Sequence, residues 1–136
     1  MLSLPRALLA DLVAQALDEA PLECCGLLAG DPATGRVQRY FRCTNAAASA
    51  RVYTVAGRDQ LRATRQAEDA GLEIIGVVHS HTHTPPYPSA TDITQAPDPT
   101  WHYAIVSLAL AEPTLRSYLI ADGAAFEEPV VVLDEV

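Results

Sequence analysis

The sequence predicts an α/β or α+β fold in which a mixed β-sheet is sandwiched by helices. Segments with the helical spacing of apolar residues alternate with segments rich in β-branched residues, in the order helix, strands, helix, strand, short helix, strands. The chain has 136 residues, of which 49% are hydrophobic. This composition can supply one hydrophobic core, so a single domain is expected over residues 1–136.

Two helices of ordinary length are expected. The first covers 5–20, because Pro5 fits a first helical turn and the helix should stop before Pro21. Its apolar residues recur at the spacing of one buried face; they are Leu8, Leu9, Leu12, Val13, Ala16 and Leu17. The second helix covers 58–70, is rich in charged residues, and ends at Gly71 as its C′ residue.

Most of the remaining apolar segments are short and are predicted to be strands. They lie at 23–31, 35–45, 51–55, 72–80, 103–110, 115–121 and 125–133. Segment 72–80 is expected to be fully buried, because its β-branched residues form a nearly continuous run. Pro129 indicates an edge position for the last strand, since proline cannot donate a hydrogen bond to a neighbouring strand.

Composition and charge argue against several functions. Seventeen acidic and nine basic residues give a net charge of −8, and no basic stripe is present, so nucleic acids and anionic membranes are not expected partners. No segment approaches the roughly 20 apolar residues of a membrane span. Three cysteines without spaced pairing do not suggest a secreted disulfide framework. We therefore expect a cytoplasmic protein, and the sequence leaves monomer and homodimer both open.

The segment "GVVHSHTHTPPYPSATD", residues 76–92, contains three of the four histidines. In an extended chain His79 and His81 project to the same side. Asp92 lies 13 positions after His79, far enough for the loop to return and supply a carboxylate. Two imidazoles and one carboxylate suit Zn²⁺ and leave the fourth position open, as in catalytic zinc sites.

A structural interpretation competes with this metal site. An HxH pair alone is a weak signal, and "SATD" also fits a capping box, with Ser89 as N-cap and Asp92 three residues later. In that interpretation Ser89 merely begins a short helix that ends before Pro97. The local pattern alone therefore leaves both readings open.

His83 offers a rival ligand. If the strand continued, it would lie on the same face as His79 and His81 and complete a histidine triad. Pro85 and Pro86 argue that regular extension stops first. His83 is therefore expected to line the substrate cleft, with ligation of the metal as the alternative.

A second element lies upstream. "PLECCGLLAG", residues 21–30, together with "HSHTHTPPYPSATD", residues 79–92, resembles the JAMM (MPN+, Mov34) zinc metalloprotease family. The family pattern has a glutamate before a CGLL.G strand, then an HxH pair followed by serine after eight residues and aspartate after eleven. Both spacings hold here. The resemblance implies an MPN/JAMM domain with a cytidine-deaminase-like architecture, of the small stand-alone prokaryotic type.

The resemblance also implies roles for particular residues. His79, His81 and Asp92 match the zinc ligands, Glu23 matches the general base, and Ser89 matches the serine that helps to stabilise the tetrahedral intermediate. The family often has proline directly after the second histidine. This sequence has threonine and then a third histidine there, so the shape of the loop entry is expected to differ.

The activity implied is hydrolysis of the bond after the C-terminal diglycine of a ubiquitin-like protein. For a compact prokaryotic member, the expected substrate is the C-terminal tail of a β-grasp sulfur carrier, in cysteine or cofactor sulfur metabolism. A broader deubiquitinase-like isopeptidase is one alternative. A non-catalytic MPN scaffold is the other, although such a module would be expected to have lost Glu23 or a histidine.

Overall fold

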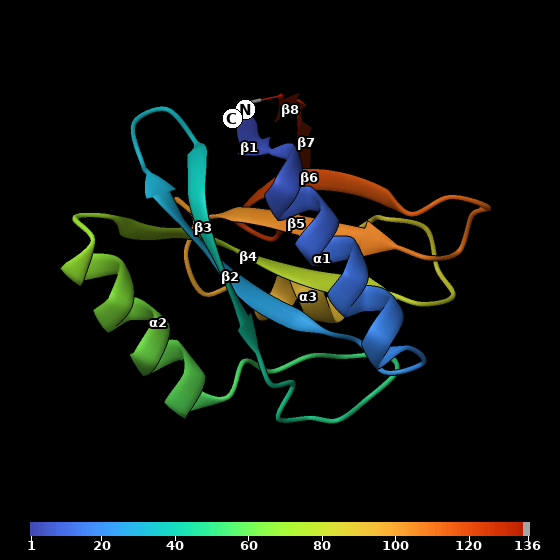
Figure 1. The fold of residues 1–136 in the computed structure, drawn as a ribbon. Coiled ribbons are helices and arrows are strands. Elements are labelled where there is room, and N and C mark those ends of the chain that lie inside the picture. Colours follow the sequence, from blue (N-terminus) through green and yellow to red (C-terminus); the bar gives the residue numbers. More distant parts are fainter. Residues whose placement is uncertain (135–136) are drawn as a thin grey trace.

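An eight-stranded mixed sheet and three helices make up residues 1–134, which the computed structural model describes (Figure 1). Residues 135 and 136, part of the expected domain, lie outside the described residues. The elements are β1 (Leu2–Pro5), α1 (Arg6–Glu19), β2 (Cys25–Asp31), β3 (Arg36–Cys43), α2 (Gly57–Asp69), β4 (Glu73–His81), α3 (Ala90–Thr94), β5 (His102–Ser107), β6 (Thr114–Ala121), β7 (Ala124–Glu128) and β8 (Val130–Leu133). The strand order is β7-β6-β5-β4-β2-β3-β1-β8, with β4 and β2 at the centre.

Helices cover both faces of the sheet, which confirms the predicted fold class. Successive residues of a strand point to opposite faces, so the central strands contribute to two separate cores. The core under α1 includes Leu12, Ala16, Leu28, Val78 and Ala104. The core under α2 includes Leu27, Ala63, Val77, Tyr103 and Ile105. Because β4 is covered on both sides, its apolar run is buried from Ile75 onward, as predicted.

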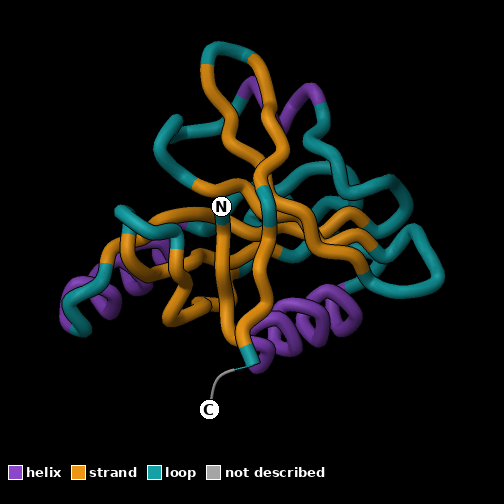
Figure 2. Tube along the Cα trace, turned by 90° about the horizontal axis from the view of Figure 1, so that it is seen from above, coloured by secondary structure: helices purple, strands orange, loops and turns teal. Residues whose placement is uncertain are grey.

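The sheet curves until its two edges approach each other. Expected strand 125–133 is divided at Pro129 into β7 and β8, and these lie at opposite ends of the strand order. The edge position predicted from Pro129 is thus confirmed for both pieces. Figure 2 shows β1 running beside β8, where Leu2 N–H donates to the Pro129 carbonyl at 2.9 Å.

The start of the chain forms a strand that the sequence analysis missed. Pro5 is the N-cap of α1 and not part of its first turn, and it is also the last residue of β1. Leu2 and Leu4 are fully buried, and β1 pairs in parallel with both β3 and β8. Strand β8 lies at the other end of the chain, so the local pattern of residues 2–5 gives no sign that they form a strand.

The buried face of α1 also differs from the prediction at one position. Leu17 is 57% exposed, whereas Gln15 is buried beside Leu12 and Ala16. Gln15 can be buried because its amide nitrogen donates to the Cys25 carbonyl at 3.0 Å, at the start of β2. A buried polar contact therefore fixes the rotation of the helix.

The expected strand at 51–55 is a loop. Within residues 1–134, this segment makes only an isolated bridge between Asn45 and Val55. The Asn45 side chain takes up backbone groups that a strand would have used: it donates to the Val52 carbonyl and accepts from Thr54 N–H, each at 3.0 Å. These bonds satisfy the backbone without a neighbouring strand.

The other two helices lie where the sequence placed them. α2 is followed by Gly71 with φ +74°, the left-handed C′ residue expected there. α3 follows Ser89 and is a single short turn. No helix in residues 1–134 combines the length and apolar character needed to cross a membrane.

The three cysteines belong to the core. Cys24, Cys25 and Cys43 are buried and unpaired. Burial raises the pKa of these thiols, to about 11 for Cys24 and Cys43 and about 12 for Cys25. They stay protonated near neutral pH and act as small apolar side chains.

Candidate metal centre

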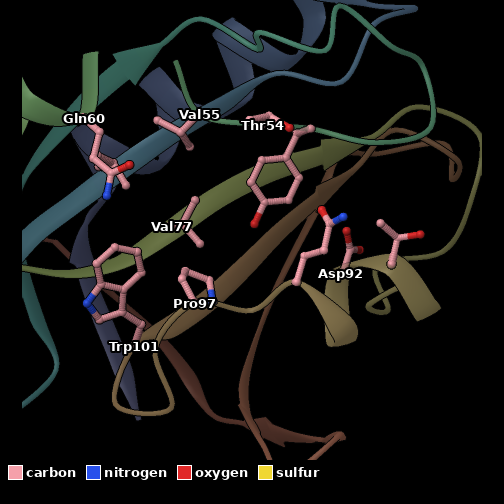
Figure 3. Close-up of a pocket in the computed structure, with 11 residues that line it drawn as sticks. Thr54, Val55, Gln60, Val77, Asp92, Pro97 and Trp101 are labelled. Atoms are coloured by element: carbon pink, nitrogen blue, oxygen red, sulfur yellow. The ribbon is translucent and has the colours of Figure 1, made fainter. Parts of the chain in front are cut away.

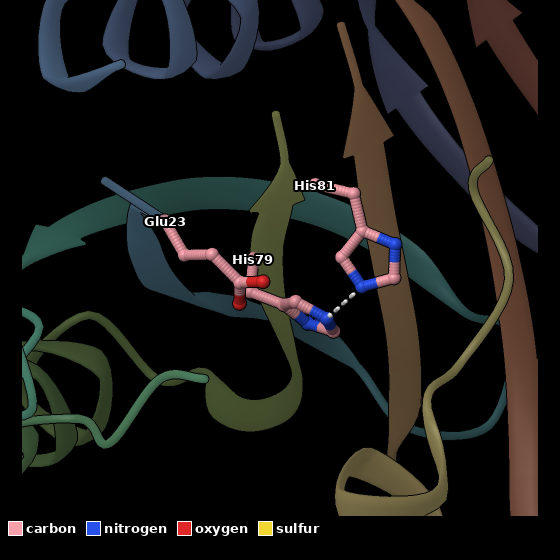
Figure 4. A group of neighbouring side chains, drawn as sticks. All are labelled: Glu23, His79 and His81. Carbon is pink, nitrogen blue, oxygen red and sulfur yellow. Dashed lines mark hydrogen bonds between the residues drawn. The ribbon is translucent and has the colours of Figure 1, made fainter. Parts of the chain in front are cut away.

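His79 and His81 lie at the C-terminal end of β4 and point to the same side (Figure 4). Both are buried, at 1% and 4% exposure, and their Nε2 atoms are 3.1 Å apart. His81 Nδ1 lies 2.9 Å from the Pro85 carbonyl, which fits a proton on Nδ1 and leaves the Nε2 lone pair for a metal. The strand ends here, so His83 does not continue the series and is exposed.

Asp92 is brought to the histidine pair by α3. Its Oδ2 atom lies 3.1 Å from His79 Nε2 and 3.3 Å from His81 Nε2. The same oxygen accepts the Ser89 N–H at 2.8 Å, while Ser89 Oγ accepts the Asp92 N–H at 3.0 Å. The capping box is therefore present, and it holds the carboxylate against the histidines. The capping box and the predicted metal ligand are therefore compatible, because the Asp92 carboxylate takes part in both.

The spacing of these three donor atoms suits a zinc ion. Bonds of 2.0–2.1 Å in a tetrahedral site imply donor atoms about 3.3 Å apart. The observed separations are 3.1, 3.1 and 3.3 Å, between two imidazole nitrogens and one carboxylate oxygen. The donor set therefore fits Zn²⁺ in type and spacing, with three protein ligands.

Glu23 is the second carboxylate near the histidines. It precedes β2, is 3% exposed, and offers a carboxylate oxygen that forms a group with His79 and His81 whose ligand atoms lie within 4.8 Å of one another (Figure 4). Its Oε1 has no hydrogen-bond partner among residues 1–134. An unpartnered buried carboxylate oxygen is costly, so this atom is available for a ligand or a proton. Glu23 lies beside the metal donors, but Asp92 has the shorter contacts to them.

The charges at the site follow from burial and these contacts. Burial raises the pKa of Asp92, but hydrogen bonds from His79 and His81 outweigh it and hold the pKa well below its usual range. Burial lowers the pKa of His79. For His81 the contacts with Asp92 and the Pro85 carbonyl outweigh burial and raise the pKa. Burial raises the pKa of Glu23 to about 7, while His81 opposes the rise. The pKa of Asp92 is thus lowered and the pKa of Glu23 is raised, so Asp92 favours its charged form and Glu23 favours its protonated form.

The loop between β3 and α2 supports the site in ways the sequence analysis missed. Asn45 donates to the Glu23 carbonyl at 3.0 Å, and Glu23 N–H donates to the Ser49 carbonyl at 2.9 Å. Tyr53 stacks on the His79 ring, with centroids 4.3 Å apart and planes at 17°. Tyr53 had been assigned to a strand. The sequence does contain one sign of this loop: Asn45 is followed by a run of small residues, as is typical of a turn.

Ser80, between the two ligand histidines, faces away from them. Its hydroxyl accepts the Cys24 N–H at 2.8 Å, and its own N–H donates to the Cys24 carbonyl at 3.1 Å. These bonds attach the end of β4 to the segment that carries Glu23. Ser80 therefore has a structural role.

Two hollows flank the donor atoms. A cleft of about 600 Å³ contains the predicted residues Glu23, His81, His83 and Ser89 in its lining. On the other side of Asp92, a pocket of about 210 Å³ is bordered by Tyr53, by polar residues such as Thr54 and Gln60, and by apolar residues (Figure 3). These apolar residues are Leu27, Val55, Val77, Pro97 and Trp101. Four of the predicted site residues thus share one cleft.

The two-sided sheet with a histidine pair at a strand end and a capped aspartate opposite places the chain in the JAB/MPN class, as the JAMM resemblance predicted. More particularly, the chain belongs to the family described as prokaryotic homologs of the JAB domain, whose model matches residues 5–121.

Named relatives and a solved structure agree with this membership. A CysO-cysteine peptidase of Mycobacterium tuberculosis is 42% identical over 127 residues, covering 91% of this chain and 86% of the relative. A desampylase of Haloferax volcanii is 37% identical over 93 residues, covering 68% and 67%. A protein of Desulfitobacterium hafniense, determined in solution, has a TM-score of 0.91 at 32% identity, covering 100% and 95%. These enzyme names support a hydrolase.

Proposed function

We propose that this chain is a zinc-dependent peptidase that hydrolyses the bond after the C-terminal diglycine of a ubiquitin-like β-grasp protein, a sulfur carrier. The observation that carries the proposal is the set of three donor atoms at tetrahedral spacing with an unpartnered glutamate beside them. The substrate class is supported by the relative named CysO-cysteine peptidase. Three buried, unpaired cysteines suit a cytoplasmic location.

His79, His81 and Asp92 would hold the zinc ion. When bound, zinc polarises a carbonyl group and makes water a stronger nucleophile near neutral pH. Asp92 would keep its negative charge in this role, since its Oδ2 also accepts the Ser89 N–H. Tyr53 would keep the His79 ring in place by stacking.

Glu23 would move the proton. Hydrolysis adds the hydroxyl group of water to the carbonyl carbon of the terminal glycine, breaks the C–N bond, and transfers a proton to the departing amine. Glu23 lies beside the donor atoms, and its Oε1 has no competing partner among residues 1–134. A buried carboxyl group poised to accept and release a proton fits general acid and base catalysis.

Ser89 would stabilise the negative charge that develops on the carbonyl oxygen. Its Oγ accepts the Asp92 N–H, which leaves the hydroxyl proton free to donate, and the residue lines the cleft with Glu23. A fixed donor aimed at a developing oxyanion is an effective form of catalysis. His83, exposed in the same cleft, would contact substrate and not the metal.

Two other functions stay as alternatives. The relative named desampylase favours a broader, deubiquitinase-like isopeptidase. A scaffold without activity is disfavoured, because Glu23, His79, His81, Ser89 and Asp92 are all present and gathered in one region.

The test is intact-mass analysis of a diglycine-ended sulfur carrier that bears one extra C-terminal cysteine. The zinc-loaded protein should remove that cysteine. Glu23→Gln should retain zinc, measured by elemental analysis, but lose turnover, whereas His81→Ala should lose both. His83→Ala is the matched control, since it removes a neighbouring histidine and should retain zinc.

Retained turnover in Glu23→Gln would contradict the assigned base. Loss of zinc in His83→Ala would restore the rival histidine triad. No removal of cysteine by the zinc-loaded protein, and no cleavage of a ubiquitin-like fusion, would favour a scaffold.

A further inference from the structure

Arg51 brings a permanent positive charge to the cleft that contains Glu23. The remaining residues that line this cleft with Arg51 and Glu23 are Ala50, His81, Thr82, His83, Thr84 and Ser89. Arg51 is the arginine among these lining residues, and its side chain stays positively charged over the whole physiological pH range.

The backbone at Arg51 is fixed relative to Glu23. Ser49 Oγ accepts the Arg51 N–H at 3.0 Å and the Val52 N–H at 3.3 Å. The Ser49 carbonyl accepts the Glu23 N–H, and the Val52 carbonyl accepts from Asn45, which also holds Glu23. Residues on both sides of Arg51 are therefore connected to the segment of the proposed base.

Arg51 is exposed. Its guanidinium group makes no ion pair with any carboxylate in residues 1–134. Some of the other arginines do pair: Arg42 with Asp11, Arg62 with Asp59, and Arg116 with Glu127. The fork of Arg51 is thus free to bind an external carboxylate in the bidentate geometry that arginine favours.

We propose that Arg51 binds the α-carboxylate of the residue that leaves, so that the enzyme removes a single C-terminal residue. This inference rests on the proposed function. In a single-residue leaving group the carboxylate is attached to the carbon next to the departing nitrogen. That nitrogen takes its proton from Glu23, in the same cleft as Arg51. In an isopeptide the departing lysine nitrogen is followed by uncharged methylene groups, which offer nothing to a guanidinium. Arg51 would therefore select terminal residues over side-chain conjugates.

The experiment compares two substrates on the zinc-loaded protein: a sulfur carrier ending in Gly-Gly-Cys with a free carboxylate, and the same protein ending in a carboxamide. We expect the unmutated protein to prefer the free acid in kcat/KM by about ten- to a hundredfold, the range of a charge-assisted hydrogen bond. Arg51→Ala should lose this preference by slowing the acid alone. Unchanged turnover of the amide shows that this variant is folded.

Two variants sharpen the test. Arg65→Ala removes an exposed arginine from α2, outside the cleft, and should keep the full preference for the acid. Arg51→Lys keeps the charge without the fork and should keep part of the preference.

Equal cleavage of acid and amide by the unmutated protein would overturn the role of Arg51 and leave the proposed function standing. A preference that survives in Arg51→Ala would do the same. If zinc is bound and neither substrate is cleaved, the proposed function fails, and this inference fails with it.

Discussion

Replacing Asn45 by aspartate should destabilise the protein and slow catalysis. The substitution keeps the shape of the side chain and its acceptor oxygen, which binds Ala47 N–H and Thr54 N–H. It replaces the two donor hydrogens that face the carbonyl groups of Glu23 and Val52. An oxygen then faces two other oxygens inside a buried loop.

The size of the effect follows from the burial of these bonds. The bond to the Glu23 carbonyl is buried, and its loss costs about 1–3 kcal/mol. The bond to the Val52 carbonyl is partly buried, and its loss costs about 0.5–1.5 kcal/mol. We therefore expect a loss of about 3 kcal/mol, a large part of the 5–15 kcal/mol that stabilises a typical domain.

Urea unfolding of the zinc-loaded protein measures the change in stability, and kcat on the cysteine-bearing carrier measures the change at Glu23. The matched control is Gln38→Glu, which makes the same amide-to-acid exchange at an exposed position of β3. A stability of Asn45→Asp within about 0.5 kcal/mol of the unmutated protein, as for ordinary surface changes, would refute this account of the loop.

Two further predictions concern Ser89 and Glu128. Ser89→Ala should lose about 1 kcal/mol of stability, because the cap of α3 is lost, and should also lose turnover. Ser89→Asn keeps a capping oxygen without the hydroxyl and should lose turnover alone; full activity of this variant in the mass assay would remove Ser89 from catalysis. Burial raises the pKa of Glu128, but bonds from His102, the Met1 ammonium and Ser117 outweigh it and hold the pKa at about 2. The folded pKa is depressed, so this stabilisation is present above pH 4.5 and is lost as the pH falls toward 2. When the pH is lowered from 6 to 3, the free energy of unfolding of Glu128→Gln should fall by about 2 kcal/mol less than that of the unmutated protein. Urea unfolding at the two pH values measures this difference, and equal falls would contradict the assignment.

The donor atoms of the site were accessible from sequence because their geometry is local. His79 and His81 are two residues apart on β4, and Asp92 shares a capping box with Ser89. Period and spacing therefore indicate that the two histidines share a face and that Ser89 caps the helix of Asp92. The return of α3 to the end of β4 followed from the family pattern and not from a local rule.

The supporting residues were not accessible in the same way. Asn45 binds Glu23, 22 positions earlier, and Thr54, nine positions later, so its role exists only in the folded chain. Its bonds turn 51–55 into a loop despite the β-branched residues there, which is a case of tertiary contacts overriding propensity. β1 was missed for the same reason, since it pairs with the last strand of the sheet.

Trp101 gives this protein an internal optical reporter. It is the one tryptophan of the chain, and it borders the pocket that Asp92 closes from the other side. All tryptophan fluorescence of the protein therefore originates from a pocket that the proposed metal ligand Asp92 also lines. A ligand that expels water from this pocket shifts the emission toward shorter wavelengths. Binding in this pocket can thus be timed in a stopped-flow instrument on the unlabelled protein, separately from the bond cleavage that mass analysis records.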